Sequence, residues 1–263
     1  MNETVEGAAA TPGANYLGSL RCAWRVPLLL LVVLGGCLLG IFLLPHGPKP
    51  GTAGAALLRN WSRLFLRCFG VRVERRGEPL RDPVMFVANH GSWMDISVLH
   101  AIRPADFVAK AEIGRWPLVG WMARRGGTIF HQRGSTDSLA QVMTVMSDRL
   151  RAGRSIAAFP EGGTAPAGTL KVFHARILQA ALDAAAPVQP VALRYLRNGA
   201  PAPDMLFTRG ESFLHNVVRV LATRSLTAEV HFLKPVPFDP EGGRRRMAET
   251  ARAEIAQVLG IAA

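Results

Sequence analysis

The sequence predicts an α/β fold with a mostly parallel central sheet flanked by helices, preceded by an N-terminal membrane helix and an amphipathic interfacial helix. Two observations lead to this prediction. Between residues 71 and 195, short apolar segments typical of strands alternate with segments of helical periodicity. Upstream, residues 26–44 form a run of 19 residues without a charged side chain, which can cross a bilayer at about 1.5 Å per residue.

Composition narrows the possible partners. The 263 residues suffice for one domain with a full core and an appendage. Lysine and arginine exceed aspartate and glutamate by 31 − 19 = 12, and so basic a surface suits anionic lipid headgroups, nucleic acid or an acidic protein. The three cysteines lie in the first quarter of the chain, which argues against a disulfide framework and fits a reducing cytosolic environment. They are Cys22, Cys37 and Cys68.

The N-terminal part divides into two regions. Residues 1–20 are small and polar, and we expect them to be disordered. A cleaved signal peptide is the alternative for the apolar run, but the run is too long and the small residues at 53–55 come too late. Positive charge is greater after the run than before it, which favours a cytoplasmic C-terminal domain. Arg21 and Arg25 precede it, while Lys49, Arg59, Arg63, Arg67 and Arg72 follow it.

A Pro/Gly linker at 45–51 leads to a second helix. Its apolar side chains recur at helical spacing, and arginines and an asparagine occupy the other side. Such a helix can lie in the lipid interface or pack on the domain core, and the two interpretations are compatible. The apolar set is Leu57, Leu58, Trp61, Leu64, Phe65 and Cys68. Residues 21–69 are therefore expected to bind the membrane, and residues 70–263 to form the main domain.

The main domain is predicted as alternating strands and helices. We expect strands at 71–74, 84–88, 107–109, 127–130, 155–159, 188–195 and 229–234. We expect helices at 93–101, 118–122, 135–152, 173–184 and 244–259.

The candidate chemistry lies in residues 89–95, Asn-His-Gly-Ser-Trp-Met-Asp, directly after a buried strand. Open α/β sheets bind ligands at this end of a strand, and a histidine titrates near neutral pH. On one ideal helix His90 and Asp95 would be about 140° apart. They can pair only if His90 lies in the turn before the helix, which Gly91 permits. The alternative stays open that Ser92 and Asp95 merely cap the helix.

Three further segments accompany this motif. They are residues 110–133, which begin Lys-Ala-Glu-Ile and end Gly-Thr-Ile-Phe-His-Gln-Arg, the Phe-Pro-Glu-Gly-Gly-Thr segment at 159–164, and Val-Gln-Pro-Val at 188–191. In this order and spacing, over about residues 70–195, the four segments resemble the glycerolipid acyltransferase superfamily, typified by the 1-acylglycerol-3-phosphate acyltransferases. The membrane anchor also resembles that of membrane-bound members.

The resemblance implies an enzyme of phospholipid biosynthesis that uses neither cofactor nor metal. It transfers a fatty acyl group from acyl-CoA or acyl-carrier protein to a lysolipid hydroxyl, converting 1-acyl-sn-glycerol-3-phosphate to phosphatidic acid. It implies His90 as general base and Asp95 as its orienting partner, Arg133 toward the anionic headgroup, Glu161 and Gly162 toward the acceptor, and a functional Lys110. The chain has no G-x-S-x-G elbow, which agrees with direct transfer. Backbone N–H groups at the start of the helix after His90 are expected to stabilise the oxyanion.

One departure opens a second acceptor. Many phosphate-accepting members carry Thr-Arg after Glu-Gly, where this chain has Gly163 and Thr164. Similar loops occur among relatives that acylate lyso-ornithine lipid, and residues 171–176 and 187–191 also resemble that branch. The acceptor is thus either 1-acyl-sn-glycerol-3-phosphate or lyso-ornithine lipid.

Two other classes of function fit the sequence less well. A non-catalytic membrane-binding protein of the same fold is disfavoured because His90 and Asp95 are both present. Nucleic-acid binding is suggested only by charge, and no zinc-finger spacing, RNA-recognition aromatics or basic zipper is present. The expected partners are anionic lipids of the bilayer and an acyl carrier, with the domain on the cytoplasmic face of the inner membrane.

Overall fold

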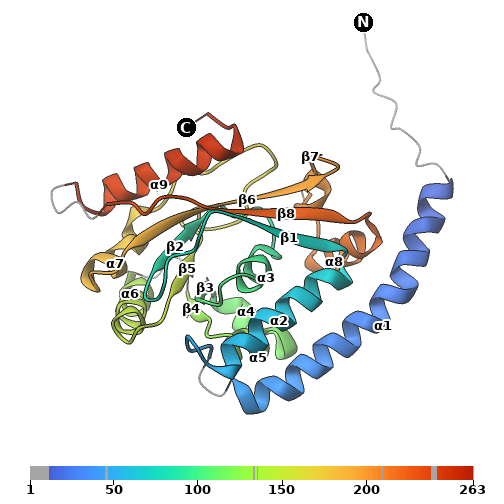
Figure 1. The fold of residues 1–263 in the computed structure, drawn as a ribbon, viewed down its shortest axis with the longest axis horizontal. Coiled ribbons are helices and arrows are strands. Elements are labelled where there is room, and N and C mark those ends of the chain that lie inside the picture. The colour runs from blue at the N-terminus through green and yellow to red at the C-terminus, as the bar shows by residue number, and fades with distance from the viewer. Residues whose placement is uncertain are drawn as a thin grey trace, which may run out of the picture.

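A central sheet organises the computed structural model, which describes residues 12–44, 47–132, 134, 136–208, 210–237 and 242–262. Across this part of the chain the strand order is β1-β8-β6-β2-β5-β3-β4, with β7 paired to β6. The strands are β1 (Val71–Arg76), β2 (Met85–Ala88), β3 (Asp106–Lys110), β4 (Ile129–His131), β5 (Ile156–Ala158), β6 (Val188–Arg197), β7 (Ala200–Pro201) and β8 (Leu226–Phe232). Pairing is parallel from β6 to β4 and antiparallel between β6 and β8. The predicted mostly parallel sheet is confirmed (Figure 1).

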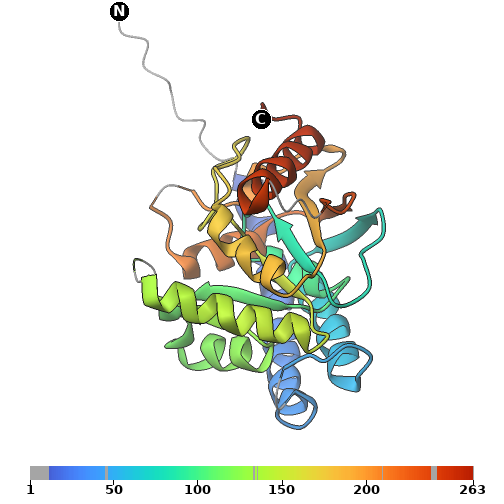
Figure 2. The same cartoon turned by 90° about the vertical axis from the view of Figure 1, so that its left-hand side faces the viewer.

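Helices cover both faces of the sheet (Figures 1 and 2). One core contains residues of α2 (Ala53–Cys68), α8 (Phe213–Ala222) and α3 (Asp95–His100), and the other contains residues of α6 (Thr136–Arg151), α7 (Gln179–Asp183) and α9 (Gly243–Leu259). Strand β2 explains the division, because Phe86 and Ala88 belong to the first core and Met85 and Val87 to the second. A strand covered on both faces must be apolar throughout.

The largest differences from the prediction lie in two helical regions of the domain. The helix expected at 173–184 is a 3₁₀ turn, Ala175–Leu178, followed by α7. The backbone N–H of His174 donates to Pro160 O at 3.0 Å, so this residue joins a neighbouring loop rather than a helix. Helix α8 was not predicted at all. It has only 10 residues, and helices this short depend on tertiary packing, which the sequence does not display.

Helix α1 (Pro12–Leu43) contains a candidate membrane span, Leu17–Leu43, with 27 residues and a mean hydropathy of 2.8. Its exposed side chains include Leu31 and Phe42, at 68% and 77% exposure, and such a face suits a lipid environment. Residues 12–20, part of the stretch expected to be disordered, form the start of this helix. Residues 1–11 lie outside the described part of the chain.

The opposite face of α1 packs along the domain (Figure 1). Arg25 donates to the carbonyls of Leu221 and Thr223 at 2.8 and 2.9 Å, and Arg21 donates to Ala222 O at 3.1 Å. These arginines therefore satisfy the free carbonyls at the end of α8. Further along, the indole N–H of Trp61 on α2 donates to Val32 O at 2.9 Å. The expected amphipathic helix exists as α2, and it packs on the core, as one of the two interpretations predicts, and also on α1. Its place in the lipid interface stays a prediction.

Candidate active site

The loop that carries His90 is fixed to the sheet by Asn89. The four residues of β2 are at most 1% exposed, and parallel pairing with β6 ends at Ala88 opposite Val191. Beyond that point the Asn89 side chain accepts from Leu193 N at 2.7 Å and donates to Leu193 O at 2.9 Å. Its amide thus replaces one more backbone rung, and His90 begins at a fixed position at the carboxyl end of the strand.

His90 and Asp95 form a pair. His90 Nδ1 lies 2.9 Å from Asp95 Oδ2, and the Asp95 side chain is fully buried while that of His90 is 17% exposed. The predicted helix at 93–101 begins only at Asp95, so His90 stands in the turn before it. This arrangement provides the geometry that a five-residue spacing requires.

The Asp95 carboxylate receives four donors. Oδ2 accepts from His90 Nδ1, Gly91 N and Ser92 N, each at 2.9 Å, and Oδ1 accepts from the Tyr195 hydroxyl at 2.5 Å. The capping and histidine-pairing interpretations of Asp95 are not exclusive, because the same carboxylate accepts from the loop backbone and from the histidine. The catalytic role of the pair stays a prediction. An ionised carboxylate only accepts, so we assign the proton to Nδ1, which leaves Nε2 with a free lone pair. Burial, and then the Asp95 charge, raise the pKa of Tyr195 and keep its hydroxyl protonated.

Glu161 holds the other side of the loop. Its carboxylate accepts from His90 N at 2.6 Å and from Lys171 N at 2.9 Å, and the residue is 4% exposed. Burial raises the pKa of Glu161, although the two backbone donors oppose that shift. Gly162 follows at φ +69°, and its N–H closes the turn onto Phe159 O at 3.1 Å. The Phe159 ring stacks on the His90 imidazole with centroids 4.0 Å apart. The segment thus positions His90 through two contacts, one to its backbone N–H and one to its ring.

Removing this carboxylate should loosen the loop. Glu161→Ala leaves the N–H groups of His90 and Lys171 without their acceptor, so we expect the free energy of unfolding to fall by about 1–3 kcal/mol. Glu161→Gln keeps one acceptor oxygen and should lose less. Urea unfolding followed by circular dichroism measures both. Glu249→Gln serves as the control, because the Glu249 side chain is 65% exposed, and an equal effect at both positions would contradict the clamping role.

A cavity of about 300 Å³ lies against the pair. Its polar lining includes Asn89, His90, Asp95, Glu161, Thr169, Arg194 and Tyr195. The remainder includes the apolar side chains Leu193, Leu196, Ala202, Leu206, Leu259 and Ile261. A cavity that joins a base to an apolar wall can accept an alcohol attached to an alkyl chain.

Two predicted site residues that the structure describes, Lys110 and Gly162, do not line this cavity. Lys110 ends β3, is exposed and does not line the cavity. Strand β5 separates β3 from β2. Arg133 lies outside the described residues, so its predicted contact with the headgroup stays a prediction. Glu161 lines the cavity, yet both of its oxygens already accept backbone N–H groups.

The sequence analysis assigned no individual role to three site residues, which are Asn89, Phe159 and Tyr195. Each occupied a predicted segment, and Tyr195 ended the predicted strand at 188–195. The position of Tyr195 at the end of a predicted strand was a signal for the site, since the carboxyl ends of parallel strands meet at one edge of the sheet. It became specific only once β6 was known to lie beside β2.

Several known proteins are similar to this chain in sequence or in fold. The acyltransferase family model matches residues 71–194. The chain is 38% identical over 181 residues to lyso-ornithine lipid O-acyltransferase of Pseudomonas aeruginosa, covering 69% of this chain and 70% of that relative. It is 29% identical over 255 residues to the enzyme of the same name from Rhodobacter capsulatus, covering 92% and 91%.

Two further comparisons involve acyltransferases named for 1-acylglycerol phosphate. The chain is 37% identical over 126 residues to 1-acyl-sn-glycerol-3-phosphate acyltransferase of Neisseria gonorrhoeae, covering 48% of this chain and 49% of that relative. Its fold matches the crystal structure of the 1-acyl-sn-glycerophosphate acyltransferase PlsC from Thermotoga maritima with a TM-score of 0.69 at 18% identity, over 95% and 99% of the two chains. With the predicted motifs in order, the His90–Asp95 pair formed and these relatives matched, this chain belongs to the acyltransferase family.

Proposed function

We propose that this acyltransferase transfers a fatty acyl group from a thioester donor to the hydroxyl of lyso-ornithine lipid. The observation that supports this acceptor is the match to lyso-ornithine lipid acyltransferases over up to 92% of the chain. The Gly163-Thr164 sequence, without the arginine of many phosphate-accepting members, points the same way. The second candidate acceptor is 1-acyl-sn-glycerol-3-phosphate, which the Neisseria relative favours.

In the proposed mechanism, His90 Nε2 removes the proton of the acceptor hydroxyl. The hydroxyl oxygen forms a bond to the thioester carbon, and the tetrahedral intermediate then breaks the carbon–sulfur bond. The imidazolium returns its proton to the departing thiolate, so no covalent acyl-enzyme forms. Asp95 orients the ring and stabilises its positive charge during the step.

The expected source of oxyanion stabilisation needs correction. The N–H groups of Gly91 and Ser92 donate to Asp95, that of Met94 donates to Ser92 Oγ, and that of Asp95 donates to Ser92 O. These groups are therefore already engaged. The expectation that the start of this helix supplies the oxyanion donors was wrong for them.

We further propose that the enzyme works at the cytoplasmic face of the inner membrane without a cofactor. Helix α1 supports membrane attachment, because its apolar exposed face is opposite the face that packs on the domain. The net charge of +12 suits anionic lipids and the acidic acyl-CoA or acyl-carrier protein. Nucleic acid is not among the proposed partners.

A side-by-side assay tests the acceptor. The purified full-length chain in mixed micelles would receive lyso-ornithine lipid or 1-acyl-sn-glycerol-3-phosphate with palmitoyl-CoA or palmitoyl-carrier protein. We expect kcat/KM to favour lyso-ornithine lipid by about tenfold or more, since a site built for one headgroup rejects another. Headgroup-resolved mass spectrometry identifies the product. A reversed preference would overturn the proposed acceptor, and inactivity with both acceptors would reject the pair.

A further inference from the structure

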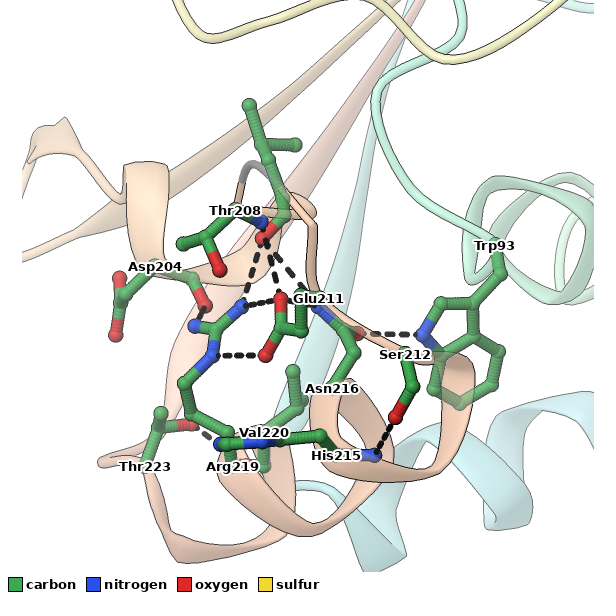
Figure 3. A network of polar contacts seen from close by, with 11 residues as sticks. Trp93, Asp204, Thr208, Glu211, Ser212, His215, Asn216, Arg219, Val220 and Thr223 are labelled. Carbon is green, nitrogen blue, oxygen red and sulfur yellow. Dashed lines mark hydrogen bonds and ion pairs between the residues drawn. The ribbon is translucent and has the colours of Figure 1, made fainter.

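A partly buried polar cluster lies beside the site cavity and takes no part in the reaction proposed above. It consists of Trp93, Glu211, Asn216 and Arg219, and we call it the α8 cluster (Figure 3). Asn216 is fully buried and the Glu211 side chain is 4% exposed. Hydrogen bonds from Arg219 hold the pKa of Glu211 well below its ordinary value, so the pair is ionised. So many charged and polar groups at low exposure require a structural or functional reason.

The cluster connects helix α8 to two other segments. Arg219 donates to both Glu211 oxygens at 2.7 and 2.8 Å, and Asn216 donates to Glu211 Oε2 at 2.9 Å. The side-chain oxygen of Asn216, Oδ1, accepts the indole N–H of Trp93 at 2.8 Å (Figure 3). Trp93 is two residues before Asp95 in the sequence. Arg219 also donates to Leu206 O at 2.8 Å and to Asp204 O. One guanidinium thus fixes the backbone of the segment that contains Leu206.

Leu206 lies directly over the loop that carries His90. It lines the cavity, and a Cβ atom on residue 91 would stand 2.8 Å from Leu206 Cδ2. Glycine at 91 therefore leaves the space that the leucine fills, one residue away from the proposed base. Ala202 and Pro203 continue the same wall.

The chemistry of the cavity indicates what this wall contacts. Among its described lining residues, Asp95 and Glu161 are engaged within the loop and Arg194 is paired with Glu229 at 2.6 Å. The wall itself is apolar. Because an apolar surface binds methylene groups rather than a charged headgroup, the fitting ligand is an alkyl chain. It can belong to the acyl donor or to the acceptor lipid.

We infer that the α8 cluster positions Leu206 as the wall of the cavity beside His90, and that Leu206 determines which alkyl chain the enzyme accepts. This inference rests on the proposed function, because it concerns the substrates of the same site. Leu206 is a specificity-determining residue in this view, and Arg219 and Glu211 are positioning residues that act through it.

Leu206 variants test the specificity. Leu206→Ala should raise the ratio of stearoyl to lauroyl transfer, and Leu206→Phe should lower it, each by roughly tenfold, the usual discrimination by a methylene-sized change in a pocket. One arm varies the donor chain with a fixed acceptor, and the other varies the acceptor chain with a fixed donor; the arm that responds identifies the chain. Leu214→Ala is the matched control, because Leu214 on α8 is 71% exposed.

Arg219→Lys and Glu211→Gln test the positioning. Both should shift the same ratio in the direction of Leu206→Ala, whereas the exposed pair variants Arg245→Lys and Glu249→Gln should not. Urea midpoints first identify any variant that fails to fold, and the remaining variant of the pair then gives the result. A chain-length ratio is informative here because a general loss of stability lowers all rates together.

The outcomes separate this inference from the proposed function. If wild-type protein acylates neither lysolipid, the proposed function fails before any variant is compared. Wild-type activity with an unchanged ratio in both Leu206 variants would overturn the role of Leu206. A shift in the Leu206 variants without one in the folded Arg219 and Glu211 variants would overturn the positioning.

Discussion

Replacing His90 with alanine should lower the rate of acyl transfer by about 10²–10⁴-fold, the contribution typical of a positioned general base. The imidazole is the group that links the buried Asp95 carboxylate to the cavity, since Nδ1 is held at 2.9 Å and Nε2 is free to accept a proton. Alanine removes the proton acceptor and leaves the Gly91, Ser92 and Tyr195 donors on Asp95 in place.

Initial rates with saturating lysolipid and thioester measure this effect, and flotation with vesicles measures membrane binding. Membrane binding should be unchanged. His90 contacts Phe159 and Asp95 within the domain, whereas the exposed apolar face belongs to α1. His90→Gln adds a second test, since glutamine retains a donor for Asp95 but cannot act as a base at neutral pH. The exposed histidine variant His215→Ala is the control. Turnover within a few-fold of wild type in either His90 variant would reject the base assignment.

The elements of the fold were largely readable because each has a local cause. Residues 84–88 are apolar at every position, and this pattern predicts a strand covered on both faces. Helix α6 carries its buried Val142, Met146 and Leu150 at helical spacing. The order of the strands was not readable, because β8 enters between β1 and β6 through contacts between residues about 155 positions apart. No local pattern encodes such a choice.

The candidate site divides in the same way. His90 and Asp95 were predictable because they are five residues apart, at the turn that leads into α3, where chain geometry decides whether they meet. Tyr195 reaches the same carboxylate from 100 residues away, so it required the sheet order. Glu161 was predicted as a site residue and lines the cavity. Its two backbone contacts could not be predicted, because a motif identifies the residue and not the partner of each oxygen.

Asp95→Asn should reduce acyl transfer by about 10²–10⁴-fold, and by no more than His90→Ala, because Asp95 acts through the His90 ring. Four donors converge on the two Asp95 oxygens, and asparagine offers only one oxygen to them. Because His90 Nδ1, Gly91 N and Ser92 N all donate to Oδ2, the favoured arrangement keeps the amide oxygen in that position and turns the NH₂ toward the Tyr195 hydroxyl oxygen. The proton then stays on Nδ1, but the negative charge that stabilises the imidazolium is lost. The histidine therefore remains in place as a weaker base.

Tyr195→Phe is the matched comparison for this change. It removes one donor from Oδ1 and leaves the three contacts of Oδ2, including His90. We expect it to lower the free energy of unfolding by about 1.5–3 kcal/mol, as for a hydrogen bond to a charged group, with a far smaller loss of rate than Asp95→Asn. Urea unfolding and initial rates on the same preparations separate the two effects. If Tyr195→Phe lost as much rate as Asp95→Asn, the carboxylate would act mainly by holding β6 against the loop, and the assignment of Asp95 as the partner that orients the histidine and stabilises its positive charge would be wrong.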